Sequence, residues 1–298
     1  MIHHVTRLPL DFKHGANIFV FGDRQEGSEG YLDEAWQEFR DEFKRTPNSY
    51  ALGVGDYGDW LRPSMRAKLL APLSQDDSSR SMLEKDILRT HDQIIDKMEF
   101  LKGRLIGLHE GHHNWTMLGG LSLDQRLASA LKAPFLGWTA STRLVLEAKK
   151  NNDSRGGYVY TMISTHGNAN GRKVASALNW MEANIVSGWD ADQYIMGHGC
   201  KSAAFSPSER NLIRRFGPAG VDHRVPRCLI VGGFCKSYTD GWQSGYAERA
   251  GFAPQPIGWG IISLKLVKRK VNSLARGVSG RRTKSLDVDN RNRYFIPD

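Results

Sequence analysis

Cysteine is scarce in this sequence. The chain has three cysteines, Cys200, Cys228 and Cys235, and no two of them form a closely spaced pair. A sparse and odd set of cysteines argues against a disulfide-stapled scaffold and is typical of proteins in a reducing compartment. We therefore expect a cytoplasmic protein.

Long apolar runs are also missing. No stretch approaches the roughly 18 consecutive apolar residues that a membrane-spanning helix needs. The first residues, MIHHVT, lack the basic region and apolar segment of a secretory signal. No internal repeat is visible. The sequence thus indicates a protein without a membrane partner.

The composition is that of an ordinary soluble globular protein, with 40% hydrophobic and 24% charged residues in a chain of 298. The net charge of +9 is concentrated near the carboxyl terminus, where residues 268–293 hold nine Lys or Arg against two Asp. We expect a domain at 1–267 followed by a basic tail at 268–298. Such a tail can contact nucleic acid or serve as a solubilising extension, and composition weighs the two equally.

The apolar pattern predicts strands that alternate with helices. Compact apolar runs predict strands at 17–21, 50–54, 104–108, 142–148, 158–163, 193–196, 227–231 and 260–266. Helical spacing of apolar residues predicts helices at 31–44, 63–73, 80–102, 123–131 and 172–186. This alternation is typical of α/β domains.

Residue types that bind metals follow five of these strands. They are Asp23 with Gln25, Asp56 with Asp59, His112 with His113, His166 alone, and His198 with Cys200. A single aspartate or histidine after a strand is usually a capping or hydrogen-bonding residue. In open α/β sheets, however, ligands collect at the carboxyl ends of the strands, so five such ends are expected to converge in one crevice. The sequence therefore predicts a metal site.

The order of these motifs resembles the calcineurin-like metallophosphoesterase family, whose motifs are D-x-H, G-D-x-x-D, G-N-H-[DE], an isolated H and G-H-x-H. The second motif is complete as GDYGD at 55–59, and the fourth is present as His166. GGF at 232–234 and GYAE at 245–248 resemble the carboxyl-terminal strands of phage and bacterial members. The resemblance implies an α/β fold with two facing β-sheets flanked by helices, a four-layer sandwich.

Three motifs depart from the family pattern. Gln25 stands where the family has histidine, His112 replaces the metal-binding asparagine, and Cys200 replaces the second histidine of the last motif. An alternative register of the third motif, at 107–110, places Leu108 at a ligand position, and leucine cannot bind a metal. We prefer the register that makes His112 a ligand and His113 the catalytic histidine.

The resemblance implies that Asp56 bridges two divalent metal ions. One site would use Asp23, Gln25, Asp56 and Cys200, and the other would use Asp56, His112, His166 and His198. Three imidazoles and a carboxylate suit Mn, Zn or Fe, whereas the first site combines a neutral amide oxygen with a soft thiolate. We expect the first site to be the weaker one, so that the protein holds one ion or two.

By the same resemblance, the protein hydrolyses phosphoesters, such as phosphodiesters or nucleotides, with a metal-activated hydroxide. His113 would stabilise the phosphoryl oxygens or protonate the leaving group, and Asn114 would hold the His113 ring in place of the family's acid. A nuclease fits as well, since the family includes DNA-repair nucleases. The alternative is a catalytically weak relative that binds nucleic acid or a phosphorylated ligand.

Overall fold

The computed structural model describes most of the chain. The described residues are 1–10, 13–60, 77–117, 119–148, 157–168, 171, 173–198, 201–207, 210–213, 221–238, 246–249, 251, 253–270 and 282–295. The helix expected at 63–73 and the expected ligand Cys200 lie outside them.

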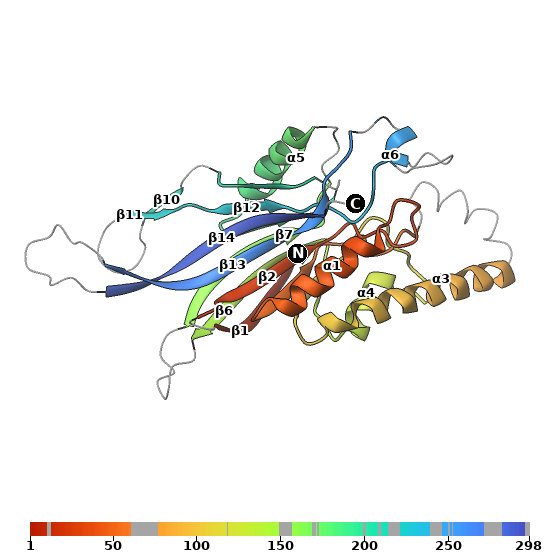
Figure 1. Ribbon diagram of the computed structural model, residues 1–298, viewed down its shortest axis with the longest axis horizontal. Helices are drawn as coiled ribbons and strands as arrows, with labels where there is room; N and C mark the ends of the chain where they lie inside the picture. The colour runs from red at the N-terminus through yellow and green to blue at the C-terminus, as the bar shows by residue number, and fades with distance from the viewer. Residues whose placement is uncertain are drawn as a thin grey trace, which may run out of the picture.

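Two six-stranded β-sheets face each other (Figure 1). The first has the order β1-β6-β7-β8-β12-β9, with β1 (Ile2–Leu10), β6 (Thr139–Ala148), β7 (Gly157–Thr165), β8 (Gln193–Met196), β12 (Arg227–Ile230) and β9 (Ala203–Phe205). The second has the order β14-β13-β2-β3-β4-β5, with β14 (Arg282–Phe295), β13 (Ile257–Lys270), β2 (Ala16–Phe21), β3 (Ser49–Gly53), β4 (Leu105–His109) and β5 (Phe135–Gly137). A separate antiparallel pair consists of β10 (Arg210–Ile213) and β11 (Val221–Arg224).

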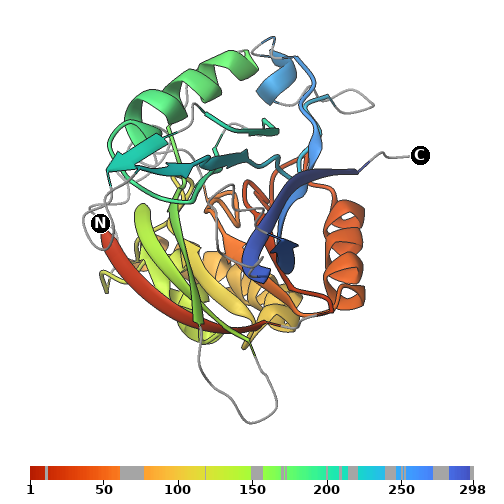
Figure 2. The ribbon, with the colours of Figure 1, turned by 90° about the vertical axis from the view of Figure 1, so that its left-hand side faces the viewer.

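Helices cover the outer faces of both sheets (Figure 2). On the second sheet lie α1 (Asp33–Arg45), α3 (Asp77–Met98) with the 3₁₀ turn Glu99–Leu101, and α4 (Leu123–Ala130). On the first lies α5 (Val174–Met181), which continues as the π-helical turn Glu182–Val186. The short α6 is Tyr246–Arg249. The expected α/β architecture, two sheets flanked by helices, is confirmed. Among the described helices, none is long and apolar enough to cross a membrane.

Strand β2 shows why both faces of the second sheet are covered. Ile18 and Val20 lie in the core between the sheets, while Phe19 and Phe21 lie in the core beneath the helices. Helix α1 meets the two phenylalanines with aromatic side chains at helical spacing, Trp36, Phe39 and Phe43. A strand buried on both faces reads as a continuous apolar run, which is why this one is visible in the sequence.

The outer strands β1 and β14 are not predicted by the apolar pattern. Both lie at the edge of their sheets. In β1, the apolar side chains of Ile2 and Val5 are exposed, and Leu8 is buried in the core between the sheets. An edge strand with much of its surface in water carries a weak hydrophobic signal, so pairing with a neighbour rather than composition defines it.

The expected boundary between a domain at 1–267 and a tail at 268–298 is wrong. Strand β13 crosses it and ends at Lys270. Residues 282–295 return as β14, which pairs with β13 in antiparallel register from Ile257↔Phe295 to Lys270↔Arg282. Residues 268–270 and 282–295 are therefore part of the second sheet, and charged residues are well tolerated on an edge strand.

Candidate metal centre

Four potential metal ligands meet where the two sheets come together. Asp56 follows β3 and His112 follows β4, both in the second sheet, whereas His166 follows β7 and His198 follows β8 in the first. One donor atom from each residue lies within 4.8 Å of the donors of the other three. The structure thus brings together all four residues that the sequence placed in one of the two expected sites.

The donor atoms face one another at short distances. Asp56 Oδ2 lies 2.7 Å from His112 Nδ1 and 3.4 Å from His166 Nε2. His166 Nε2 also lies 3.0 Å from His112 Nδ1 and 3.3 Å from His198 Nδ1. Imidazole nitrogens that converge on a carboxylate oxygen fit a shared metal ion.

Hydrogen bonds to atoms outside the cluster fix the orientation of two of these ligands. His166 Nδ1 donates to the Val54 carbonyl oxygen at 2.7 Å, so Nε2 is the ring nitrogen directed at the cluster. Asp56 Oδ1 accepts a hydrogen bond from the His113 backbone N–H at 2.9 Å, which leaves Oδ2 for the cluster. The protein therefore holds these donors in place by its own contacts.

The charges within the cluster favour a cation. Burial opposes charge on the Asp56 carboxyl, yet the positive charge and hydrogen bonds of His166 and His112 hold its pKa well below its usual range. Burial also opposes charge on His166, but the Asp56 carboxylate raises the pKa of this ring to about 9. Burial, together with His166 and His112, lowers the pKa of His198 to about 3. The carboxylate attracts positive charge, and the neutral His198 ring keeps a lone pair.

The backbone is unusual at the predicted ligands. Asp23, Gln25, Asp56 and His198 have φ angles of 45°, 45°, 57° and 54°, in the left-handed region that residues other than glycine seldom adopt. A Cβ atom on Gly111 would lie 2.1 Å from the Asp56 backbone nitrogen, so only glycine lets the loop after β4 approach so closely. Such strained loops typically cluster at functional sites.

The other expected metal site is only partly visible. Asp23 follows β2, is buried, and donates its backbone N–H to the Gly55 carbonyl oxygen at 3.0 Å. Gln25 donates its backbone N–H to the Asp56 carbonyl oxygen at 2.9 Å, and its side chain is half-buried. Within the described residues, the group of converging His, Cys, Asp and Glu donors includes Asp56 but not Asp23. The remaining expected ligand of this site, Cys200, lies outside the described residues.

His113 lies next to the cluster, and its ring has a carboxylate partner. His113 Nδ1 lies 2.7 Å from Asp59 Oδ1, the second aspartate of the GDYGD motif. Burial disfavours charge on His113, but the hydrogen bond and charge of Asp59, together with Asp56, raise its pKa. Asp59 therefore takes the orienting role that the sequence reasoning gave to Asn114.

The amide of Asn114 instead holds the loop after β4. Asn114 Nδ2 donates to Glu110 Oε1 at 3.0 Å, and Asn114 Oδ1 accepts from the Asp124 backbone N–H at 3.2 Å. Asp124 in turn accepts from the Gly111 N–H at 2.9 Å. Burial, with the nearby charges of Asp56 and Glu110, raises the pKa of Asp124 to about 8. Sequence reasoning placed Glu110 only in the alternative register of the third motif and missed Asp124, because nothing in the motif points to the first turn of α4.

His109 is a structural histidine. Its ring is fully buried, with Nδ1 2.8 Å from the Gly137 carbonyl oxygen and Nε2 2.7 Å from Ser164 Oγ. Ser164 belongs to β7 in the first sheet, so this contact links the two sheets. Burial lowers the pKa of His109 to about 4. These contacts account for His109 without a metal and agree with the register that makes His112 the ligand.

The chain matches no protein-family model and no curated protein sequence. No relative therefore assigns a role to any residue of this site. What the site can do follows from its donors, their distances and their charges.

Proposed function

We propose that the protein is a metal-dependent phosphoesterase that hydrolyses phosphodiesters or nucleotides. The observation that carries this proposal is the convergence of one carboxylate and three imidazoles, from Asp56, His112, His166 and His198, beside the Asp59-paired ring of His113. A buried donor group next to an oriented acid is the minimum that metal-assisted phosphoryl transfer to water requires.

Asp56 and the three histidines of the cluster would hold the first cation. Asp23 and Gln25 line the adjoining side, where a second cation would share Asp56. When bound, such cations supply positive charge that stabilises a phosphoryl group and lowers the pKa of a coordinated water.

His113 would act on the substrate directly. Asp59 engages Nδ1, so the other ring nitrogen, Nε2, is left to hold a proton near the substrate. Because Asp59 and Asp56 oppose the effect of burial and raise its pKa, the ring is suited to donate a hydrogen bond to a phosphoryl oxygen or a proton to the leaving group.

The second candidate function is a catalytically weak protein that uses the same centre to bind a phosphorylated ligand or nucleic acid. Gln25 on the Asp23 side favours it, because an amide provides a neutral oxygen where a charged or imidazole ligand would bind more tightly. Both candidate functions predict a bound metal ion, and only the phosphoesterase predicts turnover of a substrate.

The experiment that separates them combines metal analysis with an aryl phosphodiester assay, run with and without added manganese. A phosphoesterase should contain a transition metal as purified and release the aryl alcohol at a rate that falls on chelation and recovers on adding metal. Bound metal with no turnover under any of these metals would favour the binding protein. Absence of both would contradict the metal centre itself.

A further inference from the structure

The hairpin of β13 and β14 extends beyond the rest of its sheet (Figure 1). β13 pairs with β14 along its whole length, from Ile257 to Lys270. It pairs with β2 only at 260–264. Residues 265–270 and their partners 282–287 therefore form a two-stranded extension, which we call the basic ribbon.

Positive charge dominates the basic ribbon. Residues 265–270 and 282–287 contain six Lys or Arg and one acid, Asp287. Asp287 is the register partner of Lys265 at the base, and beyond it cations lie opposite cations, with Lys268 facing Lys284 and Lys270 facing Arg282. Like charges directly opposite each other destabilise a strand pair, and a two-stranded ribbon has little stability of its own. An anionic partner would remove this repulsion.

Protection of a sheet edge is the simplest alternative explanation. Charged residues on edge strands prevent pairing with other chains. Lys, Glu and Pro all serve this purpose, and cross-strand pairs of opposite sign would also stabilise the hairpin. Only Lys265 has such a partner, Asp287, whereas Lys268 and Lys270 lie opposite cations. Edge protection does not account for these like-charged pairs.

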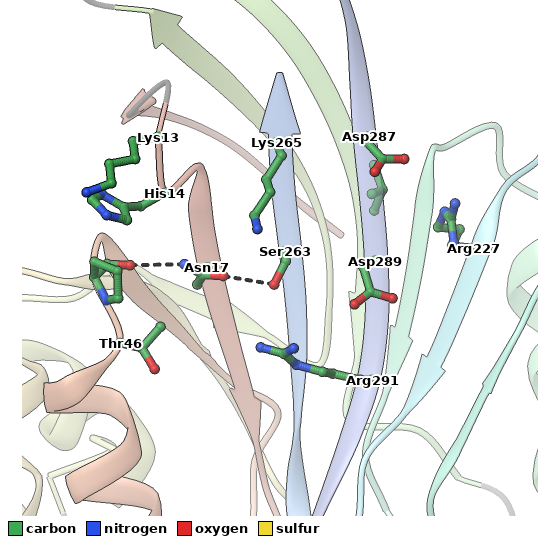
Figure 3. Close-up of a pocket in the computed structure, with 12 residues that line it drawn as sticks. Lys13, His14, Asn17, Thr46, Arg227, Ser263, Lys265, Asp287, Asp289 and Arg291 are labelled. Atoms are coloured by element: carbon green, nitrogen blue, oxygen red, sulfur yellow. Dashed lines mark hydrogen bonds between the residues drawn. The ribbon is translucent and has the colours of Figure 1, made fainter. Parts of the chain in front are cut away.

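A cavity continues the charged surface at the base of the ribbon (Figure 3). It has a volume of about 720 Å³ and lies beside β13 and β14. Figure 3 shows Arg291 reaching from β14 across the neighbouring strand β13. The lining contains four Lys or Arg and two Asp, namely Lys13, Arg227, Lys265, Arg291, Asp287 and Asp289. Cations thus outnumber anions here as well.

A second hairpin adds to the same end of the molecule. β10 and β11 extend toward the end at which the basic ribbon projects (Figure 1). Their register places Arg210 opposite Arg224, another pair of like charges. Two hairpins with facing cations at one end indicate a surface for an extended polyanion rather than for a single small anion.

We infer that the basic ribbon binds the phosphate backbone of a nucleic acid duplex. A two-stranded β-ribbon fits the major groove of B-DNA, and Lys and Arg that neutralise phosphates supply affinity independent of sequence. β13 runs antiparallel to β2, so the ribbon projects from the end of the sandwich opposite to the metal centre. It is an anchoring surface, and the inference does not depend on activity at that centre.

An anionic membrane is the other large polyanion that basic residues meet. Membrane-binding segments combine basic residues with an apolar face that enters the lipid. The apolar residues of the ribbon, Leu266, Val267 and Leu286, lie next to the sheet, and its outer part, KRK at 268–270 and RTKS at 282–285, has none. The composition of the outer part therefore favours nucleic acid.

The test measures binding of a short fluorescein-labelled DNA duplex by anisotropy over a range of salt concentrations. The full chain is compared with a variant in which Lys268, Lys270 and Lys284 are changed to Gln. Each lost phosphate contact lowers the slope of log K against log salt by about 0.9, so the variant should lose roughly 2 to 3 units of slope and at least about tenfold in affinity.

The matched control changes Lys85, Lys132 and Lys173 to Gln. These exposed lysines lie on other elements, and their loss alters the net charge by the same amount. The control should bind the duplex as wild type does. Equal affinity and slope for wild type and the ribbon variant would overturn the inference, and so would an equal loss in the control.

Folding and alternative partners are checked with the same proteins. Removing like-charged pairs should leave the melting temperature at low salt unchanged or raise it. If the triple change unfolds the chain, Lys284→Gln alone gives the comparison, with a slope change of about 0.9. Binding to vesicles of phosphatidylserine and phosphatidylcholine without DNA binding would overturn the inference in favour of a membrane. Turnover of a small aryl phosphodiester should not differ between wild type and the ribbon variant, so the ribbon and the metal centre are tested separately.

Discussion

Among the residues that the structure describes, the two sides of the metal centre differ in the donors that they bring together. On the Asp56 side, four donors from both sheets converge within 4.8 Å and hydrogen bonds from Val54 and His113 fix two of them. On the Asp23 side, a buried carboxylate stands next to the neutral amide Gln25. A site held in place by the fold binds its ion tightly, because little order is lost on binding. The comparison therefore predicts unequal metal sites.

The largest expected effect is on the Asp56 side. His166→Ala removes the ring that contacts Asp56, His112 and His198, so metal and turnover should both fall to background. Loss of an outer-shell partner costs about 10- to 100-fold in affinity, and loss of a ligand should cost more. Metal content after dialysis against a chelator gives the measurement. The control is His91→Ala, which removes a buried ring outside the cluster and should keep its metal.

The next effect separates chemistry from metal binding. His113→Ala should lower turnover of an aryl phosphodiester on the order of a hundredfold or more, as expected for loss of a general acid, and should retain the wild-type metal content. The exposed residue His3 offers the matched change, and His3→Ala should behave as wild type. If His113→Ala loses its metal as well, His113 is a ligand and its assigned role is wrong.

A smaller effect is expected on the Asp23 side. Asp23→Asn keeps the shape of the side chain and removes its charge, so binding of a second ion should weaken while the tightly bound ion on the Asp56 side remains. Titration of the metal-free protein with manganese, followed by calorimetry, gives both affinities. Two ions bound with equal affinity by the wild-type protein would contradict the prediction that the two sites are unequal.

The smallest effect concerns histidines outside the cluster. Burial, aided for His91 by the charge of Arg126, lowers the pKa of both His91 and His109 to about 4. The unfolded chain binds these protons below about pH 6.5, so the stabilising effect of the neutral rings is complete above that pH and is lost as the pH falls toward 4. Protonation of each ring should lower the free energy of unfolding by about 3 kcal/mol at pH 4. Urea unfolding between pH 7 and about pH 4 measures it, and a flat profile would contradict the assignment.

Much of the Asp56 side could be predicted because each ligand follows a strand with a strong apolar signal. Asp56, His112, His166 and His198 all come after such strands, and the carboxyl ends of these strands meet. Neighbouring residues of the same type were harder to interpret. By sequence, His109 resembles His112. Both ring nitrogens of His109, however, are hydrogen-bonded, one to the Gly137 carbonyl oxygen and the other to Ser164. Contacts between distant segments decide such cases, and a single sequence does not display them.

The basic segment was misjudged for a related reason. Residues 282–295 lack the apolar alternation of a core strand, so composition alone suggested a tail. Their structure comes from pairing with β13, which itself pairs with β2. The partner of Asp59 was missed in the same way, because its contact with His113 joins two loops that the motif treats separately.

The pairing of β2 with β13 also constrains how the chain reaches its fold during synthesis. Ile18 lies opposite Ile262, so β2 waits for a partner that is made much later in synthesis. Until that partner leaves the ribosome, one edge of β2 is unpaired and open to association with other chains. The second sheet can therefore be completed only after β13 has emerged.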